Sequence, residues 1–354
     1  VLKMEKKVKY AVVGTGSFGS HHINTLSLIR NVEIVAVCDV HRDTAEKVAG
    51  KYGIKGVYSD VDEMLAKEDI DIVTVATGDK AHKDATIKAL NAGKNVLCEK
   101  PMSLHVENCA EMIKAADKSG KILMVGQICR YTPGFIEAKR MVDEGYIGEL
   151  FYVESEYAHD YAHIPGTDNW RVDPDRDPII GGACHAIDLL RWIAGDPKEV
   201  SAFSNHKMLT TWPVNDCTVA IFKFPNDVIG KVFTSIGCKR DYTMRTVLYG
   251  SRGTIVVTNT DNHLTLYRAQ DGDEATDKFL GGVFPGADQC IRHEIPVVVN
   301  NHNIGGEQEA MIDSFLNGTP VLMTGMEGAK TVAVCCAAVE SAKKGEIVKI
   351  DYNF

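Results

Sequence analysis

The chain has no apolar run long enough to cross a membrane and no tract of biased composition. Its first residues, 1–7, lack the apolar core of a secretion signal, and its 10 cysteines include no Cys-x-x-Cys pair. We therefore expect a cytoplasmic protein with reduced thiols and no membrane partner. The formal net charge of -9, without a basic cluster among aromatics, argues against a nucleic-acid partner.

What the chain does have is enough length, 354 residues, for two domains of ordinary size. From Val8 to about Gly126, short apolar strands alternate with amphipathic helical segments. This pattern predicts an α/β domain over residues 1–127, a doubly wound parallel (Rossmann) sheet covered on both faces. The strands are expected at 10–13, 35–39, 70–76, 95–98 and 122–126.

Strand-like runs follow one another directly from about Leu150, with helical segments mostly toward the end of the chain. We expect a second, α+β domain over 128–354, built on a large and mostly antiparallel open sheet. Its strands are expected at 150–157, 199–204, 217–224, 228–235, 246–249, 254–257 and 263–267, and its helices at 182–194, 307–317 and 328–344. The polar segment 165–178, rich in Asp and Pro, reads as a loop over a site.

A Gly-x-Gly-x-x-Gly turn follows the first expected strand and opens a helix at Ser17. Such a turn lets backbone amides approach a pyrophosphate, and the helix N-terminus favours negative charge. Asp39 ends the second strand about 20 residues later, the distance at which a carboxylate accepts hydrogen bonds from an adenosine ribose. The predicted cofactor is a dinucleotide, bound here by Gly14, Gly16, Ser17, Phe18, Gly19, Asp39 and Val40.

The residues after the second strand bear on which dinucleotide is bound. Asp39 would repel the additional phosphate of NADP, which favours NAD. Arg42, three residues further on, could pair with that phosphate, which keeps NADP possible, or it could be a solvated residue of the next helix.

Two further motifs identify a resemblance that covers essentially the whole chain. Glu99-Lys100-Pro101 ends a strand, and His185-Ala-Ile-Asp188 begins a helix in the second half. Together with the glycine turn, they resemble the glucose–fructose oxidoreductase / inositol dehydrogenase / rhizopine-catabolism (GFO/IDH/MocA) family. The resemblance implies hydride transfer between a nicotinamide and a secondary hydroxyl or keto group of a sugar, glycoside or inositol-like cyclic polyol. It also implies a homodimer or homotetramer.

In that family the lysine and the histidine lie beside the nicotinamide. The resemblance therefore implies that Lys100 and His185 manage the substrate proton, with Asp188 near them. It also implies cofactor contacts from Thr77, Gly78, His82, Glu99, Lys100, Pro101 and Gln127, although His82 could equally be a packing residue. Substrate contacts are expected from Lys100, Arg130, Tyr157, His159, Asp160, Trp170, Arg171 and His185. For Arg130, an interdomain salt bridge is an equal alternative.

The chain departs from the family at Gly181, where many members carry an aspartate four residues before the histidine. A replacement carboxylate could come from Asp188, Asp160, Asp168 or Asp177, and spacing does not choose among them.

Other readings of these residues remain. We expect no metal site, because on one strand His159 and His163 would lie more than about 12 Å apart. The missing aspartate leaves open a redox-neutral glycosidase that uses bound NAD for a transient oxidation. A dinucleotide-sensing regulator without catalysis is the third reading.

Overall fold

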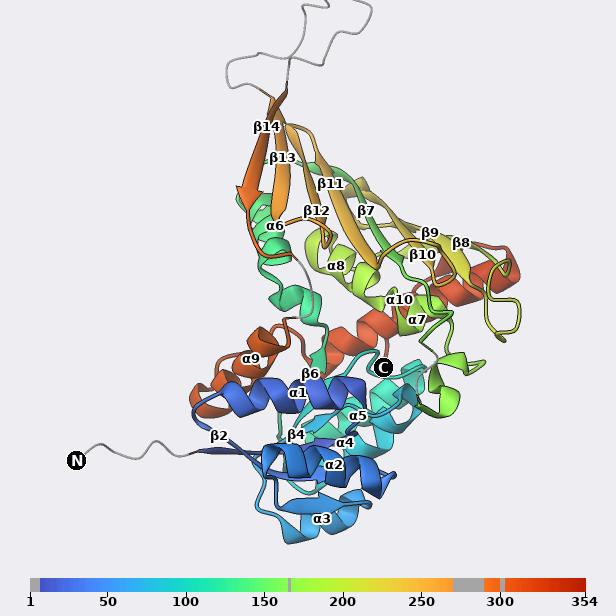
Figure 1. Ribbon diagram of the computed structural model, residues 1–354. Coiled ribbons are helices and arrows are strands. Elements are labelled where there is room, and N and C mark those ends of the chain that lie inside the picture. The colour runs from blue at the N-terminus through green and yellow to red at the C-terminus, as the bar shows by residue number, and fades with distance from the viewer. Residues whose placement is uncertain (1–6, 165–166, 270–289, 300–302) are drawn as a thin grey trace, which may run out of the picture.

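The computed structural model describes residues 7–164, 167–269, 290–299 and 303–354. Two β-sheets organise it, one built from the first third of the chain and one from the remainder (Figure 1). We refer to them as sheet A and sheet B. Within the described ranges, no helix is both long and apolar enough to cross a membrane.

Sheet A is the expected parallel sheet, with strand order β3-β2-β1-β4-β5-β6. The order reverses direction between β1 and β4, and ligands bind at the carboxyl ends of strands at such a point in open α/β sheets. Its strands are β1 Val8–Val13, β2 Val32–Cys38, β3 Gly56–Tyr58, β4 Ile72–Val75, β5 Asn95–Glu99 and β6 Leu123–Gly126.

Helices follow the strands of sheet A and return the chain to its amino edge. Buried runs such as β4, with every residue inaccessible, explain why these strands read as continuous apolar segments. The helices are α1 Ser17–Leu28, α2 Arg42–Tyr52, α3 Val61–Lys67, α4 His82–Asn91 and α5 Val106–Ser119.

Sheet B is the expected large sheet, with strand order β14-β13-β12-β11-β7-β10-β9-β8-β15. All of its neighbouring strands run antiparallel except the central pair β7 and β10. Its strands are β7 Leu150–Ala158, β8 Glu199–Asn205, β9 Cys217–Lys223, β10 Ile229–Ser235, β11 Thr243–Gly250, β12 Gly253–Thr258, β13 His263–Ala269, β14 Cys290–Pro296 and β15 Val348–Lys349.

Side chains of sheet B alternate between a buried and an open face. Val200 and Ala202 of β8 face the core together with Ala220 and Phe222 of β9, whereas Phe203 is 74% exposed on the other face. Helices cover the buried face, and we call the other face, on which side chains such as Phe203 are exposed, the open face. These helices are α6 Pro133–Asp143, α7 Pro178–Gly181, α8 Cys184–Ala194 and α10 Gly325–Lys344.

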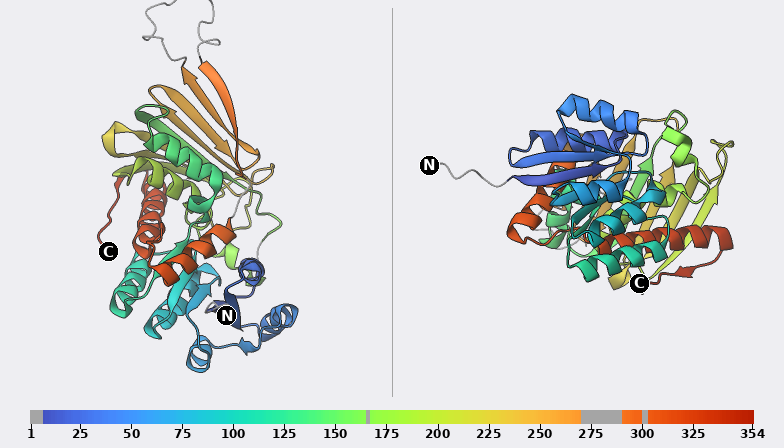
Figure 2. Two further views of the ribbon diagram at one scale, coloured as in Figure 1. Left: turned by 90° about the vertical axis from the view of Figure 1, so that its left-hand side faces the viewer. Right: turned by 90° about the horizontal axis from the view of Figure 1, so that it is seen from below.

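The last two helices tie the two parts together. Helix α9, Ile304–Asn317, packs beside α1, and α10 contacts both β8 of sheet B and α5 and β6 of the sheet A part (Figures 1 and 2). Met311 of α9 and Val332 of α10 belong to the same apolar core as sheet A. Sequence segments beyond 300 therefore complete the first domain.

The predicted fold class is confirmed, but the prediction lacked several elements. It did not contain β3, the helix α6, or the edge strands β14 and β15. The short strands β3 and β15 give too few residues for a recognisable alternation, and β14 is exposed along most of its length.

Candidate active site

The glycine turn has the close backbone contacts that its sequence predicts. Gly14 has φ +89°, and a Cβ on Gly19 would lie 1.8 Å from the Gly14 carbonyl oxygen. Gly16, the N-cap of α1, has open space where a Cβ would be, so the amides of the first helical turn are accessible. This cradle fits a pyrophosphate group, because a side chain there would fill the approach.

Asp39, directly after β2, is fixed against the same turn. Its Oδ2 accepts hydrogen bonds from the Thr15 amide at 2.7 Å and the Thr15 hydroxyl at 2.8 Å, and its Oδ1 accepts from the His41 amide at 3.0 Å. The carboxylate is thus held at the carboxyl edge of sheet A, where it can accept hydrogen bonds from a ribose.

A cavity of about 620 Å³ lies between sheet A and the second part of the chain. It is large enough for a dinucleotide's nicotinamide half and a small substrate. Of the predicted site residues, those that line it are Gly14, Gly16, Ser17, Phe18, Asp39, Val40, Thr77, Gly78, His82, Glu99, Lys100, Tyr157, His159, Trp170, Arg171 and His185. The predicted residues Gly19, Arg42, Pro101, Gln127, Arg130, Asp160 and Asp188 do not line it.

Lys100 enters the cavity from the end of β5, beyond a cluster of buried polar groups. Glu99 Oε1 lies 2.7 Å from His22 Nε2, and Glu99 Oε2 accepts a hydrogen bond from the Lys100 amide at 3.1 Å. Although burial opposes ionisation, the hydrogen bond and charge of His22 lower the pKa of Glu99. Glu307 of α9 lies beside His22 and Glu99. Each of the three side chains offers one nitrogen or oxygen atom, and these three atoms lie within 4.8 Å of one another. This cluster fixes the backbone that presents Lys100.

His82, at the start of α4, is buried beside two carbonyl oxygens. Its Nδ1 lies 2.9 Å from the Pro101 carbonyl oxygen and its Nε2 lies 3.2 Å from that of Thr77. Carbonyl oxygens only accept hydrogen bonds, so these neighbours favour the charged ring, in which both nitrogens carry protons. Burial opposes this charge, but Cys98, Asp79 and the Pro101 carbonyl outweigh it and raise the pKa of His82 to about 9.

The opposite wall of the cavity combines His185 with aromatic side chains. His185, in the first turn of α8, is 1% exposed. The Tyr157 and Tyr161 hydroxyls are hydrogen-bonded at 2.7 Å, and the His159 ring lies 4.9 Å from that of Tyr242. Burial, with the charge of Arg171, lowers the pKa of His159, so it is an uncharged hydrogen-bonding group at neutral pH. This wall offers polar atoms between apolar ring faces.

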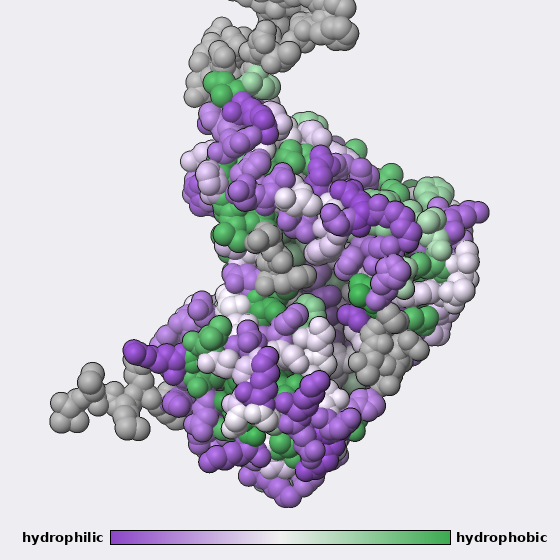
Figure 3. Space-filling view, in the orientation of Figure 1, coloured by the Kyte–Doolittle hydropathy of each residue, from purple (hydrophilic) through white to green (hydrophobic). Residues whose placement is uncertain are grey.

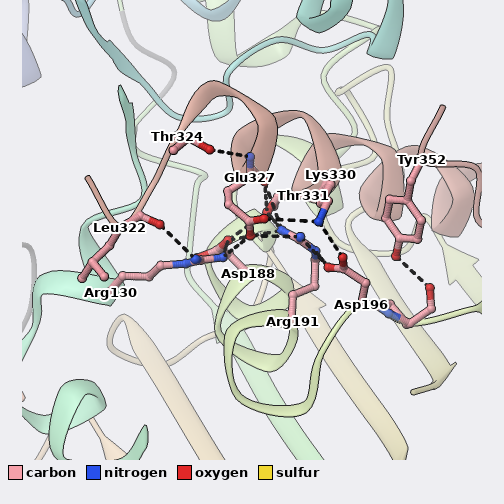
Figure 4. Close-up of polar contacts among 11 residues, drawn as sticks. Arg130, Asp188, Arg191, Asp196, Leu322, Thr324, Glu327, Lys330, Thr331 and Tyr352 are labelled. Carbon is pink, nitrogen blue, oxygen red and sulfur yellow. Dashed lines mark hydrogen bonds and ion pairs between the residues drawn. The ribbon is translucent and has the colours of Figure 1, made fainter. Parts of the chain in front are cut away.

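Asp188 and Arg130 form a buried ion pair away from the cavity (Figure 4). Arg130 donates from Nε to Asp188 Oδ2 and from Nη2 to Asp188 Oδ1, both at 2.8 Å. Thr331 of α10 donates to the same carboxylate at 2.8 Å, and Glu327 contacts Arg130 at 3.2 Å. For Arg130, the structure has a buried salt bridge, and its partners Asp188 and Glu327 belong, like Arg130 itself, to residues 128–354. Asp188 is occupied by that bridge rather than directed at the cavity.

The other candidate carboxylates are also engaged elsewhere or not described. Asp160 pairs with Lys239 at 2.8 Å, and that charge holds the pKa of Asp160 below its usual range. Asp177 caps α7 by accepting from the Ile179 amide at 3.0 Å. The side chain of Asp168 lies outside the described residues. No described alternative therefore takes the place of an aspartate at Gly181.

A guanidinium group occupies the space beside Gly181. Arg176 donates from Nη2 to the Gly181 carbonyl at 2.9 Å and from Nε to Asp79 Oδ2 at 2.6 Å. Arg176 and Asp79 are each about 95% buried, and both line the cavity. Neither was predicted as a site residue, nor were Tyr161 and Tyr242. The Asp- and Pro-rich segment 165–178 was the one sequence signal that pointed to the region of Arg176. Its partner Asp79 lies 97 residues away, so the pair itself could not be predicted.

The remaining predicted residues lie at the edges of the site. Arg42 is exposed and pairs with Glu46 at 2.8 Å on the surface of α2. Gln127 is buried after β6, and Pro101 contributes its carbonyl to His82. His159 and His163 both lie beyond Ala158, the last residue of β7, so they do not share a strand, and His163 is exposed.

The parallel sheet, its glycine turn and the cavity reaching Lys100 and His185 define a two-domain dinucleotide-dependent oxidoreductase. Two family descriptions match the chain: "Oxidoreductase family, NAD-binding Rossmann fold" over residues 8–127, and "GFO/IDH/MocA C-terminal domain" over residues 135–256. The chain belongs to the GFO/IDH/MocA family, and its cofactor is NAD.

Several curated relatives match 70% or more of this chain, and one of them matches nearly its whole length. Inositol 2-dehydrogenase 3 of Saccharopolyspora erythraea is 27% identical over 97% of this chain and 95% of its own length. Inositol 2-dehydrogenase of Salmonella typhimurium is 27% identical over 70% of this chain and 72% of its own. These relatives support an NAD-dependent dehydrogenase.

Solved structures share the fold at lower identity. A levoglucosan dehydrogenase in complex with NADH has a TM-score of 0.81 and 21% identity, covering 98% of this chain and 100% of its own. The myo-inositol 2-dehydrogenase of Lactobacillus plantarum also has a TM-score of 0.81, with 23% identity and the same two coverages. Both confirm the arrangement of the two sheets.

Proposed function

We propose that this NAD-dependent dehydrogenase oxidises a secondary hydroxyl of a sugar, a sugar derivative or a cyclic polyol, and catalyses the reverse reduction. The observation that carries the proposal is that Lys100, from the first domain, and His185, from the second, line the same cavity. The glycine turn lines that cavity too. The names of the relatives, inositol 2-dehydrogenase and levoglucosan dehydrogenase, support polyols and sugars as the substrate class.

The cofactor, when bound, supplies the hydride acceptor at its nicotinamide ring. Asp39 would hold the adenosine ribose, and the amides following Gly16 would bind the pyrophosphate. The remaining space then lies between Lys100 and the wall that carries His185, Tyr157 and Tyr161.

Oxidising an alcohol requires a proton to leave the hydroxyl oxygen as hydride leaves carbon. His185 would accept that proton, because imidazole titrates near neutral pH. The Lys100 ammonium would stabilise the negative charge that develops on the oxygen. In the reverse direction the same two groups return the proton to the alcohol.

The test is NADH formation by purified protein with NAD and a panel of inositols, free sugars and glycosides. Lys100→Met and His185→Gln should each lower kcat by about 100-fold or more while NAD affinity persists. His163→Gln, at an exposed position, is the matched control and should behave as wild type. If both variants kept wild-type kcat on an active substrate, the proposed roles would be wrong. Cleavage of a glycoside without net NADH would instead identify the redox-neutral reaction.

We also propose that the open face of sheet B pairs with a second copy of the chain. Phe203, Ile221 and Ile229 are 74%, 48% and 52% exposed on that face. Burying such apolar side chains would stabilise a dimer. Light scattering should find a dimer or tetramer for the wild type and smaller particles for Phe203→Asp. A monomeric wild type would overturn this assignment.

A further inference from the structure

Arg171 has an unusual position in the cavity. It is half-buried in the wall formed by the second domain, with its guanidinium carbon 4.2 Å from the centre of the Trp170 ring. Its charge acts on His159 and interacts with Tyr161, two residues of the same wall. Arg171 therefore faces the space assigned above to the substrate.

Two other cationic side chains that line the cavity, Arg176 and Lys88, have carboxylate partners, whereas Lys100 is assigned above to the reacting oxygen. Arg176 pairs with Asp79 at 2.6 Å, and Lys88 pairs with Asp62 at 2.7 Å. Among the residues that the structure describes, Arg171 has no carboxylate partner. Burial, together with the nearby charge of Arg176, lowers the pKa of Arg171. A partly desolvated cation without a counter-charge is costly, and a bound anion would remove that cost.

The glycine at 181 increases the positive charge at this end of the cavity. It leaves room for Arg176, whose guanidinium carbon lies 4.9 Å from the same Trp170 ring. Two guanidinium groups thus contact one indole, and Asp79 compensates for one of them. Among the side chains that the structure describes, the Arg171 guanidinium beside the aromatic wall thus has no carboxylate paired with it.

We propose that Arg171 binds an anionic group of the substrate, a carboxylate or a phosphate, so that the substrate is an acidic sugar or polyol derivative. The inference rests on the proposed dehydrogenase function and narrows its substrate class. The planar guanidinium donates two parallel hydrogen bonds, a geometry that matches both anions. The Trp170 ring holds the guanidinium in place for that contact.

The cofactor is the other source of phosphate in this cavity. Its pyrophosphate site is the amide cradle around Gly16, in the first domain, whereas the charges that act on Arg171 come from residues 157–176 and from Asp79. Arg171 therefore serves the substrate, and a variant at this position should discriminate the two sources.

The experiment compares matched compounds: glucose, glucuronate and glucose 6-phosphate, each with NAD. For the wild type, kcat/KM should be at least about tenfold higher with one of the two anionic sugars than with glucose. In Arg171→Met this ratio should fall toward one, and in Arg171→Lys it should be partly restored, with NAD Kd unchanged in both. Raising the salt concentration should raise KM for the anionic sugar. Arg30→Met, an exposed control outside the cavity, should keep the wild-type ratio.

A binding measurement separates this inference from the proposed reaction. Titration of the protein–NADH complex with the same three compounds, followed by tryptophan fluorescence, should show tighter binding of an anionic sugar even if no turnover occurs. Equal ratios in wild type and Arg171→Met would overturn the inference, as would binding of glucose alone or of none of the three. A weaker NAD Kd in Arg171→Met with unchanged selectivity would assign Arg171 to the cofactor phosphates instead.

Discussion

A Cβ atom on Gly181 would lie 2.3 Å from the guanidinium carbon of Arg176. That group is fixed by Asp79 and by the Gly181 carbonyl, in a site 4% exposed, so it has little freedom to withdraw. The space beside the end of α7 thus accepts either a side chain at 181 or the Arg176 guanidinium, but not both.

This exclusion predicts strong coupling between the two positions. Gly181→Ala should destabilise the wild type, because Arg176 must leave its buried carboxylate. In an Arg176→Met background the same substitution should cost much less, giving a coupling energy of up to about 3 kcal/mol in urea unfolding. Gly50→Ala, in the last turn of α2 with open space for a methyl group, is the control and should be neutral or slightly stabilising. Additive effects at 181 and 176 would contradict the packing described.

Alanine substitutions at two glycines of the cofactor turn should impair the protein for different reasons. Gly16→Ala has open space for its methyl group, so the protein should fold normally and lose NAD affinity, because the methyl group occupies the phosphate approach. Gly19→Ala would place Cβ 1.8 Å from the Gly14 oxygen and should lower the melting temperature as well. Thermal unfolding and NAD titration of both variants separate these effects. A normally stable Gly19→Ala protein would show that the turn is not packed in this way.

Asp39 should set the preference between the two dinucleotides. Asp39→Ala removes the ribose acceptor and the bonds to Thr15, so NAD should bind about tenfold to hundredfold more weakly. The ratio of NADP to NAD affinity should rise, because the repulsion of the extra phosphate is lost. Asp43→Ala, exposed in the next helix, is the control. An unchanged ratio in Asp39→Ala would place the ribose elsewhere.

Asp188 should behave as a structural residue. Asp188→Asn removes the carboxylate that accepts two hydrogen bonds from the buried Arg130 guanidinium, leaving only the longer contact with Glu327, and should cost about 3 kcal/mol of unfolding free energy. Asp196→Asn, which disturbs a more exposed pair with Arg191, should cost about 1 kcal/mol or less. Denaturant unfolding measures both. A stable Asp188→Asn enzyme with a shifted pH profile of kcat would instead indicate a part in proton transfer.

Glu307 should make stability fall as pH rises. Burial, with the charge of Glu99, raises its pKa well above the usual value, and neither carboxyl oxygen has a hydrogen-bond partner among the described residues. The pKa of Glu307 is higher in the folded than in the unfolded protein. Its contribution to the free energy of unfolding is therefore complete below the ordinary glutamate pKa of about 4.3, and it is lost as the pH rises from there through the folded pKa. The melting temperature of Glu307→Gln relative to wild type should therefore increase from pH 5 to pH 8. Glu309→Gln, exposed on the same helix, should show no such trend.

Local sequence patterns were sufficient for much of the fold and for the cofactor half of the site. The turn at Gly14 and the acid at Asp39 lie on adjacent strands of one βαβ unit, so their relation is set within 25 residues. The strands β4 and β8 were likewise predictable, the first from its continuous apolar run and the second from its alternation. In both, the strand's own residues determine which face is buried.

The charge partners of the site were not predictable in the same way. Arg130 and Asp188 are 58 residues apart, and Arg176 and Asp79 are 97 apart, so only the tertiary packing of distant segments decides these pairs. Sequence reasoning gave Asp188 a place beside His185, since both begin the same helix. Residues three apart lie on neighbouring positions of a helix face, but His185 lines the cavity while Asp188 pairs with Arg130, a partner that the helix pattern does not reveal.

Because α9 and α10 pack against the sheet A part, residues 1–127 are unsuitable for transfer to another protein on their own. A gene fusion ending at residue 127 would carry all six strands of sheet A but would omit Met311 and Val332, which fill its core. Without α10 the edge strand β6 would be exposed, and without α9 one side of α1 would be exposed. Both surfaces could then associate with other chains. Recombination that preserves function would need to exchange residues 304–344 together with the first segment.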